Sequence, residues 1–85
     1  MINEISQIVG NVIKQMCVKK VEEDSNQKGH KILIETILNT LKQKKVHCDD
    51  KTLRYVLTQY NNGEGMIIDG NTLKLSPNLV LQIAK

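Results

Sequence analysis

Residues 50–61 of this sequence combine an apolar stripe with a polar stripe of hydrogen-bonding side chains. The apolar residues recur at i, i+3, i+4 and i+7, which predicts a helix with one buried face. They are Leu53, Val56, Leu57 and Tyr60. The opposite face holds Lys51, Tyr55, Thr58, Gln59 and Asn62, with Arg54 beside it. Amide and guanidinium groups form paired hydrogen bonds to base edges, whereas an ordinary solvated helix face has the same polar character. Side-chain type alone leaves both interpretations open.

Lysines gather just before this polar stripe. An ammonium group binds a phosphate as a point charge, so these lysines are candidate contacts to a nucleic-acid backbone. They are Lys42, Lys44 and Lys45, with Lys74 later in the chain, and Lys19, Lys20 and Lys31 join them if the fold brings these close. Lysines at helix ends also serve solubility, which is the competing explanation.

A third chemical candidate is the tripeptide His47-Cys48-Asp49, which has the residue types of a nucleophile or a metal ligand set. A catalytic triad or a zinc site needs three or four converging groups, and only His30 and Cys17 are left to complete one. A turn with a half-buried cysteine is therefore the favoured interpretation. We expect no enzyme activity, no metal and no cofactor.

The elements that position these groups follow from the periodicity of the apolar residues. Helices are predicted over residues 3–21, 30–44 and 50–61, with a polar loop over 22–29. From residue 66 the period changes to two, which predicts a hairpin over 66–75 turning at Gly70-Asn71. Ser76-Pro77 has the residue types of a helix start, so a short helix is expected over 77–84. The single domain would thus begin with an N-terminal helix within residues 1–21 and end with a C-terminal helix within residues 76–85.

Length and composition fit one small α+β domain. The chain has 85 residues, of which 40% are hydrophobic and 25% charged, values typical of a soluble globular protein. No apolar run exceeds three residues, so no transmembrane segment is expected. Two cysteines are too few for a disulfide scaffold, which favours an intracellular location, cytoplasmic or nuclear.

The order of helix, helix, turn, capped helix, hairpin and short helix resembles the winged-helix variant of helix-turn-helix proteins. The resemblance is carried by residues 32–45, the turn 46–49, the helix 50–61 and the hairpin 66–75. It implies a winged-helix-like core over 30–75 and a small, dimeric DNA-binding transcription regulator that reads duplex DNA through its third helix and hairpin. One departure is visible, because many winged helices place a strand between the first two helices, whereas here the candidate strand is 46–48.

Charge distribution supports a different function. Residues 46–64 carry three carboxylates against two cations, and carboxylates near phosphates are unfavourable. The alternative is a protein-interaction module, a small subunit or inhibitor whose acidic edge meets a basic partner. That edge would consist of Asp49, Asp50, Glu64 and Asp69. The first helix also has a wide apolar stripe, which suggests a partner or homodimer interface at Ile5, Ile8, Val12 and Ile13.

Overall fold

The computed structural model describes residues 2–60 and 64–85 and confirms an α+β domain. Its elements are α1 (Ile2–Glu23), β1 (His30–Leu33), α2 (Ile34–Gln43), α3 (Asp50–Tyr60), β2 (Met66–Asp69), β3 (Thr72–Leu75) and α4 (Pro77–Ala84). The strands form one antiparallel sheet in the order β1-β3-β2. This is the layout of a small winged-helix-like domain. The last predicted residue of the helix over 50–61 lies outside the described residues, as does the side chain of Tyr60 from its apolar stripe.

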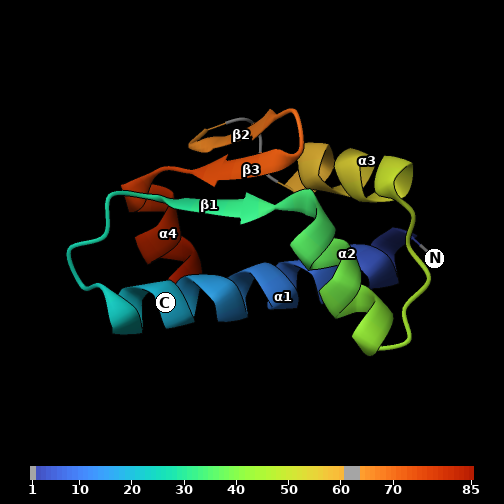
Figure 1. Cartoon of the computed structure of the whole chain (residues 1–85), viewed down its shortest axis with the longest axis horizontal. Helices are drawn as coiled ribbons and strands as arrows, with labels where there is room; N and C mark the ends of the chain where they lie inside the picture. Colours follow the sequence, from blue (N-terminus) through green and yellow to red (C-terminus); the bar gives the residue numbers. More distant parts are fainter. Residues whose placement is uncertain (1, 61–63) are drawn as a thin grey trace.

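The helix α1 runs along the side of the domain opposite the sheet, and the other helices lie against it (Figure 1). It contacts α2, α3 and α4, so its apolar side chains face three neighbours. This explains its wide apolar stripe. Val12 and Ile13 are fully buried in the core, and Ile5 and Ile8 are partly buried against it. The predicted partner interface is therefore wrong at Val12 and Ile13, because a surface patch cannot include side chains that the domain's own helices cover.

The segment 30–33 is a strand, not the start of the predicted helix over 30–44. Ile32 is buried and lies opposite Leu73 of β3, while its neighbours Lys31 and Leu33 are exposed. The triplet Ile32-Leu33-Ile34 fits both a helical and an extended period, so the pattern alone did not decide. Pairing with β3 decides it, and the backbone N–H of Ile34 then donates to the carbonyl of Asn71 at 2.8 Å.

The position of β1 differs from the strand position predicted from the sequence, which was 46–48. The strand β1 lies between the first two helices, where many winged helices have one, and residues 46–48 are not a strand. The structure also extends the first helix to Glu23, which shortens the polar loop.

The predicted hairpin register is confirmed. Ile68 lies opposite Leu73 and Met66 opposite Leu75, and these side chains point into the core. Gly70, the first turn residue, has a φ of +60°, which a hairpin turn of two residues requires and glycine adopts without strain.

Side-chain caps are present at the starts of α3 and α4. The Asp49 carboxylate accepts a hydrogen bond from the backbone N–H of Thr52 at 2.8 Å, which caps α3. The Ser76 hydroxyl accepts one from the N–H of Leu79 at 3.2 Å, with Pro77 at the first position of α4.

The turn between α2 and α3 begins with a Schellman motif. The N–H of Val46 donates to the carbonyl of Leu41, and the N–H of Lys45 donates to that of Lys42, both at 2.9 Å. Lys45 occupies the left-handed position with a φ of +60°, where glycine is the usual residue. The motif therefore sets the path from α2 to α3 at the expense of strain at one lysine.

We expect Lys45→Gly to stabilise the domain by about 0.5–1 kcal/mol, because glycine adopts a positive φ without the steric clash of a Cβ. The matched control is Lys44→Gly, which removes the same charge at a φ of −84° and should destabilise the helix end. Thermal unfolding of the two variants measures the difference. Equal melting temperatures would show that Lys45 is not in the left-handed conformation.

Candidate nucleic-acid interface

The helix α3 divides into a buried and an exposed face at the predicted positions. Leu53, Val56 and Leu57 are buried in the core. Tyr55 is 53% exposed, and Lys51, Thr58 and Gln59 are also exposed. The Thr58 hydroxyl donates to the carbonyl of Arg54 at 2.8 Å, which leaves its oxygen free to accept. We call Lys51, Tyr55, Thr58 and Gln59 the α3 outer face. Asn62, predicted to belong to it, lies outside the described residues.

Arg54 lies beside the α3 outer face, but its guanidinium is bonded within the protein. Nε donates to the Asp50 carboxylate at 2.6 Å, one terminal nitrogen donates to the Gly70 carbonyl at 2.7 Å, and the other donates to the Asn71 side-chain oxygen at 2.9 Å. Arg54 therefore ties α3 to the hairpin turn. The i, i+4 spacing of Asp50 and Arg54 was a readable signal for the ion pair, whereas nothing local in the sequence points to the turn.

Loss of this tie should be measurable. Arg54→Ala is expected to lower the free energy of unfolding by about 1–2 kcal/mol. The loss is no larger because solvent partly screens the Asp50–Arg54 ion pair. In a double-mutant cycle with Asn71→Ala, denaturant unfolding should give a coupling of about 0.5 kcal/mol or more. If the losses in unfolding free energy of the two single variants simply add, the hydrogen bond between Arg54 and Asn71 is contradicted.

The carboxylates of the proposed acidic edge are mostly engaged inside the domain. Asp50 pairs with Arg54, and Asp69 pairs with Lys74 at 2.9 Å. Asp49 caps α3, and the hydrogen bond from Thr52 lowers its pKa. The hydrogen bond and charge of Lys74 likewise lower the pKa of Asp69. These contacts occupy carboxylate oxygens that a basic partner would otherwise meet, but they leave the net charge of residues 46–64 unchanged.

The lysines considered from the sequence lie in two regions, one around the end of α2 and one at the start of β1. Lys42, Lys44 and Lys45 are exposed at the end of α2 and the turn that leads into α3. Lys19 and Lys44 line a groove of about 880 Å³ beside α1. Lys20, Lys31 and Lys74 line a depression at the start of β1, the end of the sheet remote from the hairpin turn and Arg54.

Four of these cations around the turn and α3 are not balanced by ion pairs. Among residues 2–60 and 64–85, the ion pairs involve Lys19, Arg54 and Lys74. The lysines without one near α3 are Lys42, Lys44, Lys45 and Lys51. Asp49 and Asp50 offset two of the cations in residues 42–55, and the remaining lysines give the turn and the first half of α3 an excess of positive charge.

The hairpin does not project as a free wing. Strands β2 and β3 are four residues each, and β3 pairs with β1 over its whole length. The turn at its tip lies beside α3 and is held there by Arg54 (Figure 1). Lys74, a predicted phosphate contact, is paired with Asp69 on this hairpin. The α3 outer face is thus more available to a ligand than the hairpin.

The residues with nucleophile and metal-ligand chemistry do not converge. Burial raises the pKa of Cys17 to about 11, so this thiol stays protonated at neutral pH. Partial burial and the charge of Asp49 also raise the pKa of Cys48. Within the described part of the chain, no three His, Cys, Asp or Glu side chains are grouped to hold a metal ion. In the same residues, no helix is both long and apolar enough to cross a membrane.

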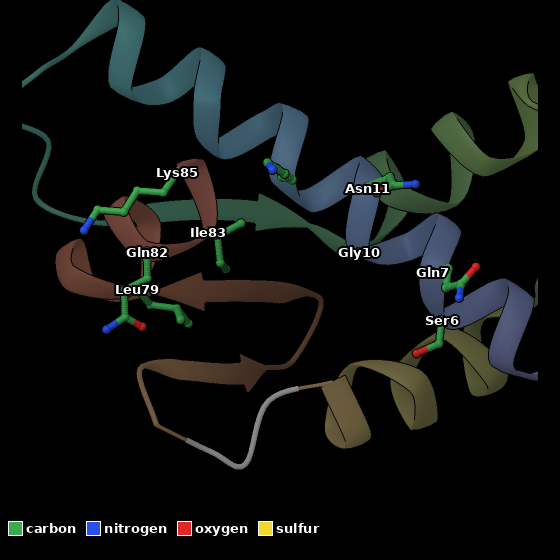
Figure 2. Close-up of a pocket in the computed structure, with 9 residues that line it drawn as sticks. Ser6, Gln7, Gly10, Asn11, Leu79, Gln82, Ile83 and Lys85 are labelled. Carbon is green, nitrogen blue, oxygen red and sulfur yellow. The ribbon is translucent and has the colours of Figure 1, made fainter.

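A groove of about 1010 Å³ lies between α1 and α4 (Figure 2). Its walls include Ser6, Gln7 and Asn11 of α1 and Leu79, Gln82 and Ile83 of α4. None of its lining residues is a carboxylate, histidine or cysteine, so it offers no acid–base pair.

The chain was compared with known proteins. No family model, no curated protein and no solved structure matches it. The function is therefore inferred from the geometry alone.

Proposed function

We propose that this protein is a small winged-helix-like nucleic-acid-binding regulator that contacts duplex DNA through α3. The observation that carries the proposal is the pairing pattern around α3. Asp50 is paired with Arg54, and three lysines without an ion pair among the described residues lie beside the α3 outer face, which adds a fourth, Lys51. A helix that presents such a row next to a cationic turn meets both needs of duplex recognition, phosphate binding and contact to base edges.

The proposed roles follow from the chemistry of each side chain. Gln59 has the side-chain amide that pairs with adenine. The Thr58 hydroxyl oxygen can accept a hydrogen bond from a base. Lys51 and Tyr55 supply a cation and a phenol hydroxyl on the same face. Arg54 acts as a positioning residue that fixes α3 against the hairpin turn.

Phosphate contacts are assigned to the lysines of the turn. Lys42, Lys44 and Lys45 are exposed and, among the described residues, form no ion pair. Phosphate neutralisation supplies most non-specific affinity, so these three should dominate binding to mixed-sequence duplex.

The second candidate, a protein-interaction module, is favoured by the uncovered face of the sheet rather than by the acidic edge. Ile67 is 61% exposed and Leu33 is 53% exposed on that face, where no helix covers them. Large apolar side chains exposed on one sheet face are a feature of partner surfaces, and here Thr72 and Lys74 of β3 lie between the two strands that carry them. The two functions predict different surfaces, α3 for DNA and the sheet for a protein.

Replacing Lys42, Lys44 and Lys45 together with glutamine should weaken duplex binding at least tenfold at about 50 mM salt. The slope of log affinity against log salt should fall by about 2–3, since each phosphate contact contributes about 0.9. Fluorescence anisotropy with a labelled mixed-sequence duplex at several salt concentrations measures both quantities.

The matched control removes three lysines elsewhere, Lys14, Lys31 and Lys85, and should weaken binding by less than about threefold. Equal losses in the two triple variants would show that only net charge matters. Absence of duplex binding by the unmodified protein at low salt would overturn the proposal.

A further inference from the structure

A second cationic site lies at the end of the sheet away from α3. It is a depression of about 560 Å³ where the end of α1, the loop before β1, the end of β3 and the start of α4 meet. We call it the β1-end pocket. Its basic lining residues are Lys20, Lys28, His30, Lys31 and Lys74.

The wall of this pocket is held in place by a buried side chain. Gln27 is 6% exposed and is the one buried polar side chain among the described residues. Its side-chain oxygen accepts from the N–H of Gly29 at 2.6 Å, and its side-chain nitrogen donates to the carbonyl of Pro77 at 3.0 Å. Gly29 and Pro77 both line the pocket, so one amide fixes two of its walls.

Gly29 fits this wall closely against β3. Its φ is +106°, and a Cβ there would lie 2.6 Å from the carbonyl oxygen of Leu75. The loop is therefore pre-organised, which lowers the entropic cost of binding a ligand.

The charges around the pocket are positive and only partly compensated. In the described part of the chain, Lys20, Lys28 and Lys31 form no ion pair, whereas Lys74 is paired with Asp69. Partial burial, together with the charge of Lys20, lowers the pKa of His30, while Glu23 acts in the opposite direction. Glu23 itself is 4.0 Å from Lys19. Burial and the charge of Lys20 therefore both disfavour the charged form of His30.

We propose that the β1-end pocket binds a small oligophosphate anion through Lys20, Lys28 and Lys31. Three unpaired ammonium groups match a ligand that carries more than one phosphate. The lining contains no Phe, Tyr or Trp, and His30 is its single aromatic ring, so the phosphate chain is the main recognised part. This site is separate from the duplex-binding function proposed for α3.

Nuclear magnetic resonance of the full chain titrated with pyrophosphate at low ionic strength tests the proposal. We expect saturable shifts of the Gly29, His30 and Lys31 amides. The pKa of His30 should rise in the complex, because the anion favours its charged form. The His47 amide, which lies next to α3 in the sequence, should show no saturable shift and serves as an internal control.

Paired variants separate the pocket from general charge. Lys20→Gln with Lys31→Gln should weaken pyrophosphate binding at least tenfold, while Lys42→Gln with Lys44→Gln should change it less than twofold. Equal weakening by both pairs, or no saturable shift in the unmodified protein, overturns the proposal. Because the second pair belongs to the proposed duplex contacts, failure of one site is distinguishable from failure of the other.

A parallel titration with ATP identifies the source of the phosphate chain. Affinity within threefold of that for pyrophosphate supports the site and assigns it to the phosphate chain alone. Affinity more than tenfold higher supports the site and assigns it to nucleotides. If either probe instead causes chemical-shift changes mainly at residues outside the β1-end pocket, the proposed site is overturned.

Discussion

Gly29→Ala is expected to destabilise the domain by about 3 kcal/mol, from two effects that add at one position. A residue with a Cβ is strained at a φ of +106°, at a cost of about 1–2 kcal/mol. The new Cβ would also lie 2.6 Å from the carbonyl oxygen of Leu75, so backbone must move. That movement would disturb the contacts of the Gln27 amide with Gly29 and Pro77.

Gly70→Ala is the matched control for this substitution. Gly70 also has a positive φ, but no atom lies within 4 Å of the position a Cβ would take. Its cost should therefore be the strain alone, about 1–2 kcal/mol. Urea unfolding of both variants gives the difference. If the two costs are equal, the close approach of the loop to β3 is wrong.

Leu73→Ala should cost about 3–4 kcal/mol, because it opens a cavity at the centre of the sheet. Leu73 is fully buried on the middle strand, between Ile32 of β1 and Ile68 of β2. Neighbouring strands hold these residues in place, so the cavity cannot close easily. In a domain of this size such a loss is a large part of the total stability.

The control for Leu73 is an apolar residue on the other face of the same sheet. Ile67 is 61% exposed, and Ile67→Ala should cost less than about 1 kcal/mol. Thermal unfolding of both variants tests the register directly, since a slip by one residue would exchange the two faces. Comparable losses for Leu73 and Ile67 would contradict the pairing.

The parts of the fold that the sequence predicted well are those with a strong local signal. The hairpin register followed from matching parity on both sides of Gly70-Asn71 and is confirmed. The start of α3 followed from the capping chemistry of the adjacent Asp49 and Asp50, of which Asp49 forms the cap. In both cases residues close in the chain determine the structure.

The strand β1 was missed because its signal is long-range. Three consecutive apolar residues, Ile32 to Ile34, fit a helix as well as a strand. Only the pairing of Ile32 with Leu73, 41 positions later, selects the extended form. The buried role of Gln27 was missed for the same reason, since its partner Pro77 is distant in sequence.

The candidate site shows the same division. The α3 outer face could be predicted because it follows from helical periodicity around Leu53, Val56 and Leu57. The role of Arg54 could not, because two of its three contacts are with the hairpin turn. The separation of the lysines into distinct surfaces also depends on packing, which segment charges do not record.

The most direct test of the proposed function is the footprint of duplex DNA on the protein. A titration of isotope-labelled protein with a short duplex at low salt, followed residue by residue by nuclear magnetic resonance, locates the contact surface. We expect the largest shifts at Lys51, Tyr55, Thr58 and Gln59 and at the turn lysines before α3. Shifts confined to the uncovered sheet face around Leu33 and Ile67, or no shifts at all, would contradict DNA binding through α3.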